Sequence, residues 1–252
     1  MTRIILCGCM GRMGKAITEI VAETEGAEIV CGVDLVSGDC GYPVHSDYAD
    51  VVEEADAIID FSHPSNFNKL LAFAKAKQLP VVFATTGLSE DQRAEMKKAA
   101  DEIPVFFSAN MSLGINLLIR LAKQAATILE DKYDIEIIEK HHNRKLDAPS
   151  GTALAIADAI SESLTNAPEY VYDRHSVRKQ REKNEIGLHA IRGGTIVGEH
   201  DVLFAGPDEV LTISHSAASR SVFAQGAVRA AQFMNGKPKG FYSMDDLFAD
   251  MV

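Results

Sequence analysis

The stretch Arg3-Ile-Ile-Leu-Cys-Gly-Cys-Met-Gly-Arg-Met-Gly14 decides the fold of the amino-terminal part of this chain. Its pattern predicts a short apolar strand, a glycine-rich turn and then a helix over 15–25. Spaced glycines let a backbone approach a pyrophosphate, and the positive end of a helix dipole favours such an anion. The same glycines would also serve a tight turn with close helix packing, so the flanking sequence must decide between the two.

The sequence after this helix favours the nucleotide-binding alternative. A strand over 27–33 ends at Asp34, about 20 residues after Gly14, which is the spacing at which an acidic side chain meets an adenosine ribose. Residues 37–49 are polar and lack periodicity. Strands and helices then alternate, with strands over 56–61, 80–84 and 104–108 and helices over 64–77 and 89–101. We therefore predict an α/β, Rossmann-like, doubly wound parallel sheet over about the first 110 residues.

Ligands of such sheets bind at the carboxyl ends of the strands. In this chain those ends carry small or hydrogen-bonding residues that suit a nicotinamide carboxamide and its ribose. Each group taken alone is ordinary turn chemistry. The groups are Ser62-His63-Pro64, Ala84-Thr85-Thr86-Gly87 and Ser108-Ala109-Asn110-Met111.

The pattern changes in the second part of the chain. A helix is predicted from Ser112 to about residue 129, and residues 166–185 are polar and aperiodic, as in a long loop or lid. Three segments resemble antiparallel strands, with a hairpin turn at 205–208. We expect a second, α+β domain with a mixed sheet. The three segments are 188–191, 195–204 and 209–215, and they precede a final helix over 219–235 and an aromatic tail over 240–248.

The segment EKHHNRKLDAPSGT, residues 139–152, holds two imidazoles and three cations within one short run. Its surroundings predict a strand over 133–138, a loop over 141–149 and a helix that begins near Ser150. The Ser150 hydroxyl is a suitable N-cap. Packing alone does not require such a density of polar groups.

The start of this helix is a candidate anion site. The backbone N–H groups of Gly151 and Thr152 are expected there, with Lys140, Arg144 and Lys145 around them. A solvated charged loop would explain the cations alone, and an ordinary capped helix would explain the helix start alone. The chain as a whole is acidic, yet cations are in excess at this helix start. Their combination favours an anion site over two unrelated features.

Composition excludes several classes of function. The chain has 252 residues, a formal net charge of −11 and no apolar run of the ~18 residues that span a membrane. Its acidity argues against general nucleic-acid binding. The amino terminus enters a strand without a signal-peptide layout, so we expect a cytoplasmic protein. The four cysteines form no Cys-x-x-Cys pair, and the adjacent histidines diverge, so we expect reduced thiols and no metal site.

These motifs resemble those of the dihydrodipicolinate reductase family, the 4-hydroxy-tetrahydrodipicolinate reductases of bacterial lysine and diaminopimelate synthesis. The resemblance covers essentially the whole chain. Its most specific motif is Glu-x-His141-His142-x-x-Lys145-x-Asp147-Ala-Pro-Ser-Gly-Thr152-Ala. Supporting matches are Gly8–Gly14, Asp60-Phe-Ser, Thr85-Thr-Gly87, Ser108-Ala-Asn-Met111, Arg192-Gly-Gly194, Gly198-Glu-His200 and Ser219-Arg220.

The resemblance implies an enzyme that uses NADH or NADPH to reduce 4-hydroxy-tetrahydrodipicolinate, a cyclic imine dicarboxylate, to tetrahydrodipicolinate. It also implies a homotetramer, a dinucleotide-binding domain of 1–111 with 219–252, and a domain over 112–218 for substrate binding and oligomerisation. By the same resemblance His141 is the proton donor and Lys145 assists it. The implied substrate contacts are His142, Ser150, Gly151 and Thr152, and the implied cofactor contacts are Gly8, Cys9, Met10, Gly11, Arg12, Met13, Asp34, Ala84, Thr85, Thr86, Ser108, Ala109, Asn110 and Met111.

The chain departs from the family pattern at a few positions. Ala84 stands where the family usually has glycine, and Met111 where an aromatic residue is common. Members that use NADPH well tend to carry an arginine after the acidic residue, whereas Leu35 follows Asp34 here, with Lys15 the only nearby substitute. We therefore expect both cofactors to be used, with NADH preferred.

Two other functions are compatible with the same residues. One is a dehydrogenase for a different small amino or keto dicarboxylate, and the other is a regulator that senses a nucleotide. The regulator is disfavoured, because the chain has no DNA-binding motif and a sensor needs no proton donor beside an anion site.

Overall fold

The computed structural model describes residues 1–130 and 132–251. The chain divides into two compact units, one of Met1–Leu113 with Arg220–Val252 and one of Gly114–Ser219. Each unit has its own sheet and its own apolar core. Among the described residues, no helix combines the length and the apolar composition that crossing a membrane requires.

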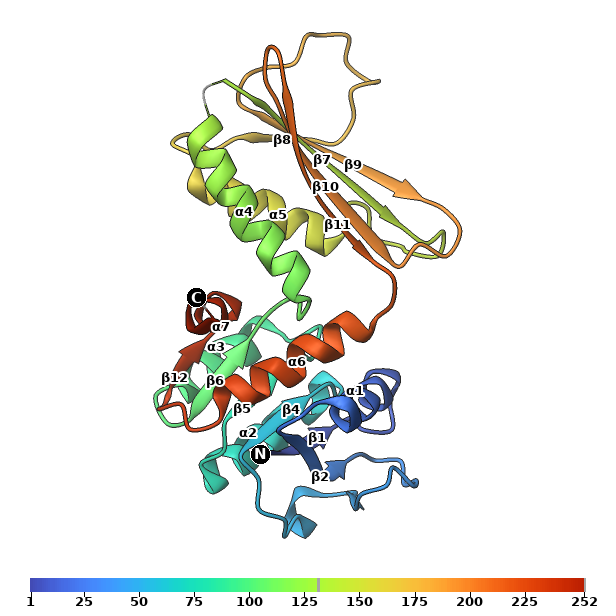
Figure 1. Cartoon of the computed structure of the whole chain (residues 1–252), viewed down its shortest axis with the longest axis vertical. Helices are drawn as coiled ribbons and strands as arrows, with labels where there is room; N and C mark the ends of the chain where they lie inside the picture. Colours follow the sequence, from blue (N-terminus) through green and yellow to red (C-terminus); the bar gives the residue numbers. More distant parts are fainter. Residues whose placement is uncertain (131, 252) are drawn as a thin grey trace. The chain divides into compact units, whose positions relative to one another are not determined.

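The first unit contains a seven-stranded sheet in the order β12-β6-β5-β4-β1-β2-β3, and every neighbouring pair is parallel (Figure 1). The predicted parallel α/β sheet is confirmed. Two of its strands were missed, because β3 has two residues and β12 three, too few for a periodic pattern. The strands are β1 Thr2–Cys7, β2 Ala27–Val33, β3 Val44–His45, β4 Ala57–Asp60, β5 Val81–Phe83, β6 Pro104–Phe107 and β12 Gly240–Tyr242.

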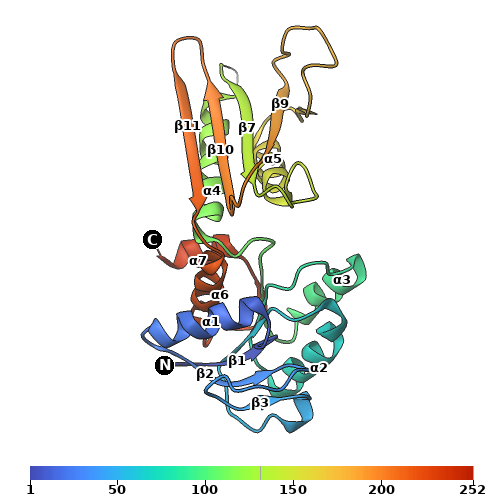
Figure 2. The same cartoon turned by 90° about the vertical axis from the view of Figure 1, so that its right-hand side faces the viewer.

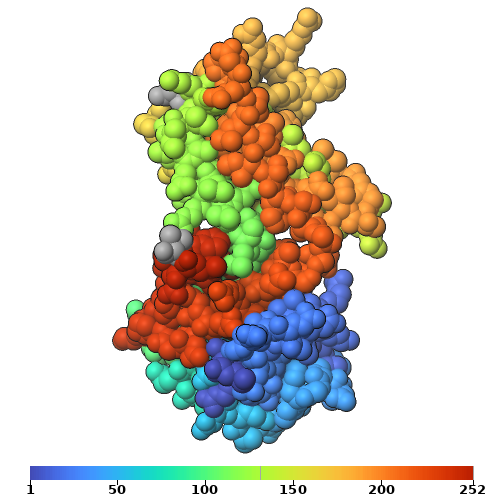
Figure 3. All heavy atoms as spheres, viewed as in Figure 1, coloured from blue at the N-terminus to red at the C-terminus, as the bar shows by residue number. Residues whose placement is uncertain are grey.

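Helices cover both faces of this sheet. On one face α1 (Arg12–Glu23) lies beside α6 (Ser221–Met234), as the blue and orange-red atoms of Figure 3 show, and both contribute to one apolar core. On the other face α2 (Phe67–Lys77) and α3 (Glu90–Ala99) cover a second core. The chain after residue 220 thus returns to the first sheet, as the family resemblance implied. The remaining elements are the short helices η1 Tyr48–Asp50 and η2 Pro64–Asn66 and the helix α7 Met244–Met251. The segment of η2 is the start of the helix predicted over 64–77, whereas the sequence pattern did not indicate η1 or α7.

The second unit has a mixed five-stranded sheet in the order β11-β10-β7-β9-β8 (Figure 2). Strand β10 is antiparallel to β7 and β11, whereas β9 is parallel to β7 and β8. The prediction of antiparallel strands is thus confirmed for β10 and β11, which pair with each other, and wrong for β9, which pairs in parallel with β7 and β8. Helices α4 (Leu113–Leu129) and α5 (Gly151–Ser163) share the core of this sheet. The strands are β7 Asp134–His141, β8 Glu169–Val171, β9 Glu185–Arg192, β10 Gly198–Ala205 and β11 Val210–Ala217.

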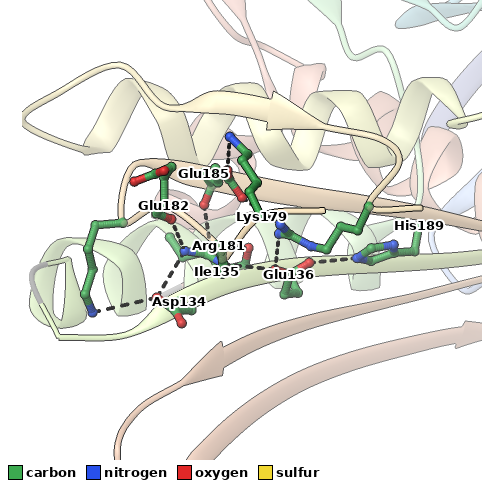
Figure 4. Close-up of polar contacts among 10 residues, drawn as sticks. Asp134, Ile135, Glu136, Lys179, Arg181, Glu182, Glu185 and His189 are labelled. Atoms are coloured by element: carbon green, nitrogen blue, oxygen red, sulfur yellow. Dashed lines mark hydrogen bonds and ion pairs between the residues drawn. The ribbon is translucent and has the colours of Figure 1, made fainter. Parts of the chain in front are cut away.

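The polar segment predicted as a loop or lid contains β8 and is tied to the sheet by ion pairs (Figure 4). Arg174 reaches Glu185 at 2.7 Å and Glu136 at 2.8 Å, and Arg181 reaches Glu136 at 3.1 Å. The Glu185 side chain is fully buried, and the hydrogen bond from Arg174 lowers the pKa of its carboxyl to about 2. Charge pairs rather than apolar periodicity hold this segment, which explains why its sequence resembles that of a free loop.

Candidate functional site

The glycine turn of the first unit is shaped by close backbone approach. Gly8 has φ of +80°, and a Cβ added there would lie 2.8 Å from the Phe61 carbonyl oxygen. A Cβ at Gly14 would lie 2.3 Å from the Gly8 carbonyl oxygen. Gly11 is the N-cap of α1 and provides no side-chain cap. The helix begins at Arg12, three residues earlier than expected, so the turn presents backbone rather than side chains to the space beside it.

A cavity of about 620 Å³ lies against this turn. Asp34 lines it, and its carboxylate accepts hydrogen bonds from the Met10 amide at 2.9 Å and the Val36 amide at 3.0 Å. Lys69 also lines it and lies 3.5 Å from Asp47, with both side chains more than half exposed. Lys15 is thus not the only cation near Asp34, since Lys69 belongs to the same cavity. The glycine turn, the acid and the cavity fit a dinucleotide.

The strand ends beside the turn are organised by a buried carboxylate. Asp60 Oδ1 accepts from the Ser62 hydroxyl at 2.6 Å, and Oδ2 accepts from the Thr85 hydroxyl at 2.6 Å. Burial raises the pKa of Asp60, and the hydroxyl bonds oppose the rise. The Thr85 hydroxyl is therefore committed to Asp60, which leaves its backbone and its neighbours for a ligand.

The other predicted cofactor contacts occupy varied positions. Ala84 is buried and Thr86 is exposed. The Ser108 hydroxyl donates to the Asn110 carbonyl at 2.7 Å and closes the turn after β6. Met111 is buried, and its carbonyl lies where a side chain on residue 226 of α6 would be. In the glycine turn, Cys9 is buried, Met10 and Met13 are partly buried, and Gly11 and Arg12 are exposed. Ala109, in the turn after β6, is exposed as well.

In the second unit, His141 is the last residue of β7 rather than part of the following loop. Its Nδ1 lies 2.6 Å from Oε2 of Glu139, whose side chain is buried. Arg192 donates to both Glu139 oxygens, at 2.7 and 2.6 Å, and the Ser150 amide donates at 2.9 Å. Burial alone would raise the pKa of Glu139, but these hydrogen bonds outweigh it and lower the pKa. An ionised carboxylate only accepts, so His141 Nδ1 carries the hydrogen and Nε2 remains the nitrogen that can exchange a proton.

His200 of β10 completes this buried cluster. Its ring lies 5.3 Å from that of His141, and its Nε2 is 3.3 Å from the Ser150 hydroxyl. Burial, assisted by the nearby His141, lowers the pKa of His200 to about 4, so His200 is neutral near pH 7. Arg192 and His200 had been noted only as motif matches, without a role. Only the pairing of β7 with β9 and β10 brings them to His141.

The start of α5 agrees with the sequence in part. The Ser150 hydroxyl accepts from the Ala153 amide at 3.2 Å, so the predicted N-cap is confirmed. Lys145 pairs with Asp147 at 2.9 Å, and this pairing lowers the pKa of the Asp147 carboxyl. Lys140 instead pairs with Glu199 and Asp201, at 3.0 and 3.1 Å. Its expected place at the helix start is wrong, because consecutive residues of a strand face opposite sides.

Three more residues of the predicted substrate site surround this helix start. His142 is partly buried, and its Nδ1 has no hydrogen-bond partner within residues 1–130 and 132–251. Thr152 is partly buried and Gly151 exposed, while Arg144 is exposed in the loop. A Cβ on Gly151 would meet nothing within 4 Å, so there is open space over the helix start. The buried pair of Glu139 and His141 thus lies beside the start of α5, through the hydrogen bond from the Ser150 amide to Glu139.

Comparison with known proteins places the chain in a family. The family described as "Dihydrodipicolinate reductase, N-terminus" matches residues 2–111, and "Dihydrodipicolinate reductase, C-terminus" matches residues 114–248. A 4-hydroxy-tetrahydrodipicolinate reductase from Caldanaerobacter subterraneus subsp. tengcongensis is 56% identical over 247 residues, 98% of either chain. One from Clostridium novyi is 47% identical over 248 residues, again 98% of either chain.

Solved structures share the fold. The dipicolinate-bound dihydrodipicolinate reductase from Paenisporosarcina sp. TG-14 has a TM-score of 0.81 at 23% identity, covering 96% of this chain and 97% of that one. Scyllo-inositol dehydrogenase from Lactobacillus casei, solved with NAD(H) and scyllo-inositol, has a TM-score of 0.58 at 12% identity, covering 98% and 92%. With two family matches that together span nearly all of its length and relatives well above 40% identity, the chain belongs to the dihydrodipicolinate reductase family.

Proposed function

We propose that the chain reduces 4-hydroxy-tetrahydrodipicolinate to tetrahydrodipicolinate with NADH or NADPH, in the synthesis of diaminopimelate and lysine. The observation that carries this proposal is the full-length, 56% identical relative that bears the name of this activity. The dipicolinate in the related solved structure is itself a cyclic dicarboxylate, which supports a substrate of that class.

The first unit is proposed to hold the dinucleotide, which supplies a hydride when bound in its reduced form. The glycine turn offers backbone N–H groups at the start of α1 for the pyrophosphate. Asp34 retains acceptor capacity for ribose hydroxyls beyond the two amides that it already binds. The strand-end residues near Thr85 and Asn110 are proposed to contact the nicotinamide half.

The second unit is proposed to bind the substrate and supply the proton. His141 would release a proton from Nε2, because Glu139 holds Nδ1 at 2.6 Å and so leaves Nε2 as the nitrogen that can exchange one. Lys145 would leave Asp147 to pair with a substrate carboxylate, since the open space over Gly151 admits one. His142 would use its unpaired Nδ1 on the same substrate.

The test is an assay of dihydronicotinamide absorbance with freshly made condensation product of aspartate semialdehyde and pyruvate. We expect absorbance to fall only when protein, reduced dinucleotide and this product are all present. Controls lacking pyruvate or aspartate semialdehyde separate this reaction from reduction of another dicarboxylate. Binding of dinucleotide without any turnover would contradict the proposal and favour a nucleotide sensor.

We also propose that the chain forms a homotetramer and works in the cytoplasm. Strand β11 is at the edge of the second sheet, and Val210 and Leu211 on it are 60% and 43% exposed. Apolar side chains on an open sheet edge favour association. Light scattering during size exclusion should give four times the chain mass, and Leu211→Lys should lower it. A monomeric wild-type protein would contradict this assembly.

A further inference from the structure

One side-chain cluster in the first unit is not used by the reaction described above. Cys31 of β2, His45 of β3 and Glu53, which follows η1, bring one ligand atom each within 4.8 Å of one another. His45 Nε2 lies 3.0 Å from both Glu53 oxygens. Within the part of the chain that the structure describes, this is the one group of three such residues.

The sheet explains how the three residues meet. His45 is opposite Val33 in the β2–β3 pair, and Cys31 is two residues before Val33, so Cys31 and His45 face the same side. The segment after η1 places Glu53 over that side. Cys31 is buried, whereas His45 and Glu53 are partly exposed. The cluster is thus buried on the Cys31 side and open to solvent on the side of His45 and Glu53, where an ion can enter.

Thiolate, imidazole and carboxylate are the ligand types that zinc uses. Zinc lies about 2.0–2.3 Å from such donors, so tetrahedral neighbours are roughly 3.5 Å apart, and small rotations bring atoms within 4.8 Å to that spacing. An ion pair between His45 and Glu53 is the simpler alternative. In that alternative the Cys31 thiol, which comes from a different strand, also interacts with the Glu53 carboxylate. A cation would engage all three groups at once.

We propose that Cys31, His45 and Glu53 bind one divalent cation of the zinc class, with water in the fourth position. On binding, the sulfur–metal bond replaces the Cys31 S–H bond, and the proton is released to solvent. No change of metal oxidation state is involved. The proposal stands on these three residues and does not depend on the reductase reaction.

The site would link β2 and the edge strand β3 to one wall of the dinucleotide cavity. The chain between His45 and Glu53 carries Ser46, Asp47 and Tyr48, which line the cavity that also contains Asp34. A cation held at both ends of this segment would restrict its motion. Metal-loaded protein should therefore bind dinucleotide several-fold more tightly than metal-free protein.

The test uses the full-length protein, reduced and stripped of metal, titrated with Co²⁺ as a spectroscopic substitute for Zn²⁺. We expect one equivalent to bind with a sulfur-to-cobalt charge-transfer band. Cys31→Ser should abolish the band, and His45→Gln and Glu53→Gln should each weaken Zn²⁺ binding at least tenfold. Cys40→Ser, at a half-buried thiol outside the cluster, is the matched control and should retain the band.

X-ray absorption of the zinc-loaded wild-type protein makes the test independent of whether the variants fold. The expected zinc shell has one sulfur at about 2.3 Å and nitrogen or oxygen donors at about 2.0–2.1 Å. A shell of nitrogen and oxygen alone would overturn the proposal, as would a cobalt band that survives Cys31→Ser and is lost in Cys40→Ser. Absence of stoichiometric binding would overturn it as well.

Discussion

Both units bury an acidic side chain near the carboxyl end of a central strand, but the groups that hydrogen-bond to it differ in charge. Asp60 of β4 is held by the hydroxyls of Ser62 and Thr85, and its burial raises its pKa. Glu139 of β7 is held by Arg192 and His141, and its pKa is lowered in spite of burial. The partners of the first acid are uncharged hydroxyls, whereas the second acid is a negative charge held between a guanidinium and an imidazole.

This difference matches the proposed tasks of the two units. The hydroxyl partners of Asp60 bring no cation to the strand ends beside the glycine turn, so the helix dipole and the backbone amides of the turn are the groups that would bind an anion there. The Glu139 carboxylate at Nδ1 of His141 determines which ring nitrogen can release a proton. Substitutions that remove charge but keep shape should therefore affect the two units unequally.

The largest effect is expected on the free energy of unfolding, which Glu139→Gln should lower more than Asp60→Asn does. Glu139→Gln leaves the Arg192 guanidinium, 19% exposed, without its anion, and loss of one partner of a buried pair costs about 3 kcal/mol or more. Asp60→Asn keeps an acceptor for one hydroxyl and should cost under about 1.5 kcal/mol. Hydrogen exchange of the β7 and β4 amides, with and without urea, measures each unit separately.

The pH dependence of the same pair gives a second measurement. Since the pKa of Glu139 is lowered on folding, its stabilisation is present above the unfolded value near ~4.3 and is lost as pH falls below it. The Glu139→Gln penalty should therefore shrink below about pH 4. Asp60 has a raised pKa, so its contribution to stability grows as pH falls. Equal penalties for both variants at neutral pH would remove the contrast between the units.

The same contrast explains what the sequence could predict. The glycine turn could be predicted because backbone geometry requires glycine at positions 8 and 14, and Asp34 follows at a characteristic spacing. Strand and helix alternation likewise indicated the parallel sheet. Arg192 and His200 had no assigned role, because they reach His141 only through the pairing of β9 and β10 with β7. The short strands β3 and β8 could not be predicted either, since two or three residues are too few to show the alternation of a strand.

The next effect concerns turnover. His141→Gln or Lys145→Ala should lower kcat by ~100-fold or more, the scale of a positioned acid–base group, with dinucleotide affinity unchanged. His175→Gln changes an exposed histidine of the same unit and should keep full activity. Lys145→Arg should recover part of the loss, because it keeps the charge. Steady-state kinetics and a dinucleotide binding titration check this, and near-normal turnover in both main variants would exclude the proposed proton donor and its partner.

A smaller effect should distinguish the two helix starts. Gly14→Ala places a Cβ 2.3 Å from the Gly8 carbonyl oxygen, so the backbone must shift at a cost of about 1–3 kcal/mol. We expect dinucleotide affinity to fall at least tenfold. Gly151→Ala meets nothing within 4 Å, and alanine favours a helix over glycine by up to about 1 kcal/mol. Denaturant midpoints should separate the variants; equal destabilisation would show that the two starts are packed alike.

The smallest effect concerns the choice of cofactor. Asp34 lines the dinucleotide cavity, and Leu35 after it supplies no cation, so a 2′-phosphate there would meet a negative charge. At a solvent-open site this repulsion is worth ~1 kcal/mol, or about fivefold to tenfold in affinity, and we propose use of both cofactors with NADH preferred. Lys69 is the cation placed to reduce the difference, once it leaves Asp47. Lys69→Ala should therefore lower kcat/KM for NADPH and leave that for NADH unchanged.

Leu35→Arg sharpens this last prediction, because it adds the missing cation and keeps the hydrogen bonds that Asp34 accepts from the Met10 and Val36 amides. It should shift the ratio of kcat/KM values toward NADPH, and Asp34→Ala added to it should shift the ratio further, although that change also releases the two amides. The ratios should be compared at low ionic strength, where repulsion is least screened. A wild-type preference for NADPH above tenfold would mean that Lys69 outweighs Asp34, so that the wall of the cavity rather than the end of β2 selects the cofactor.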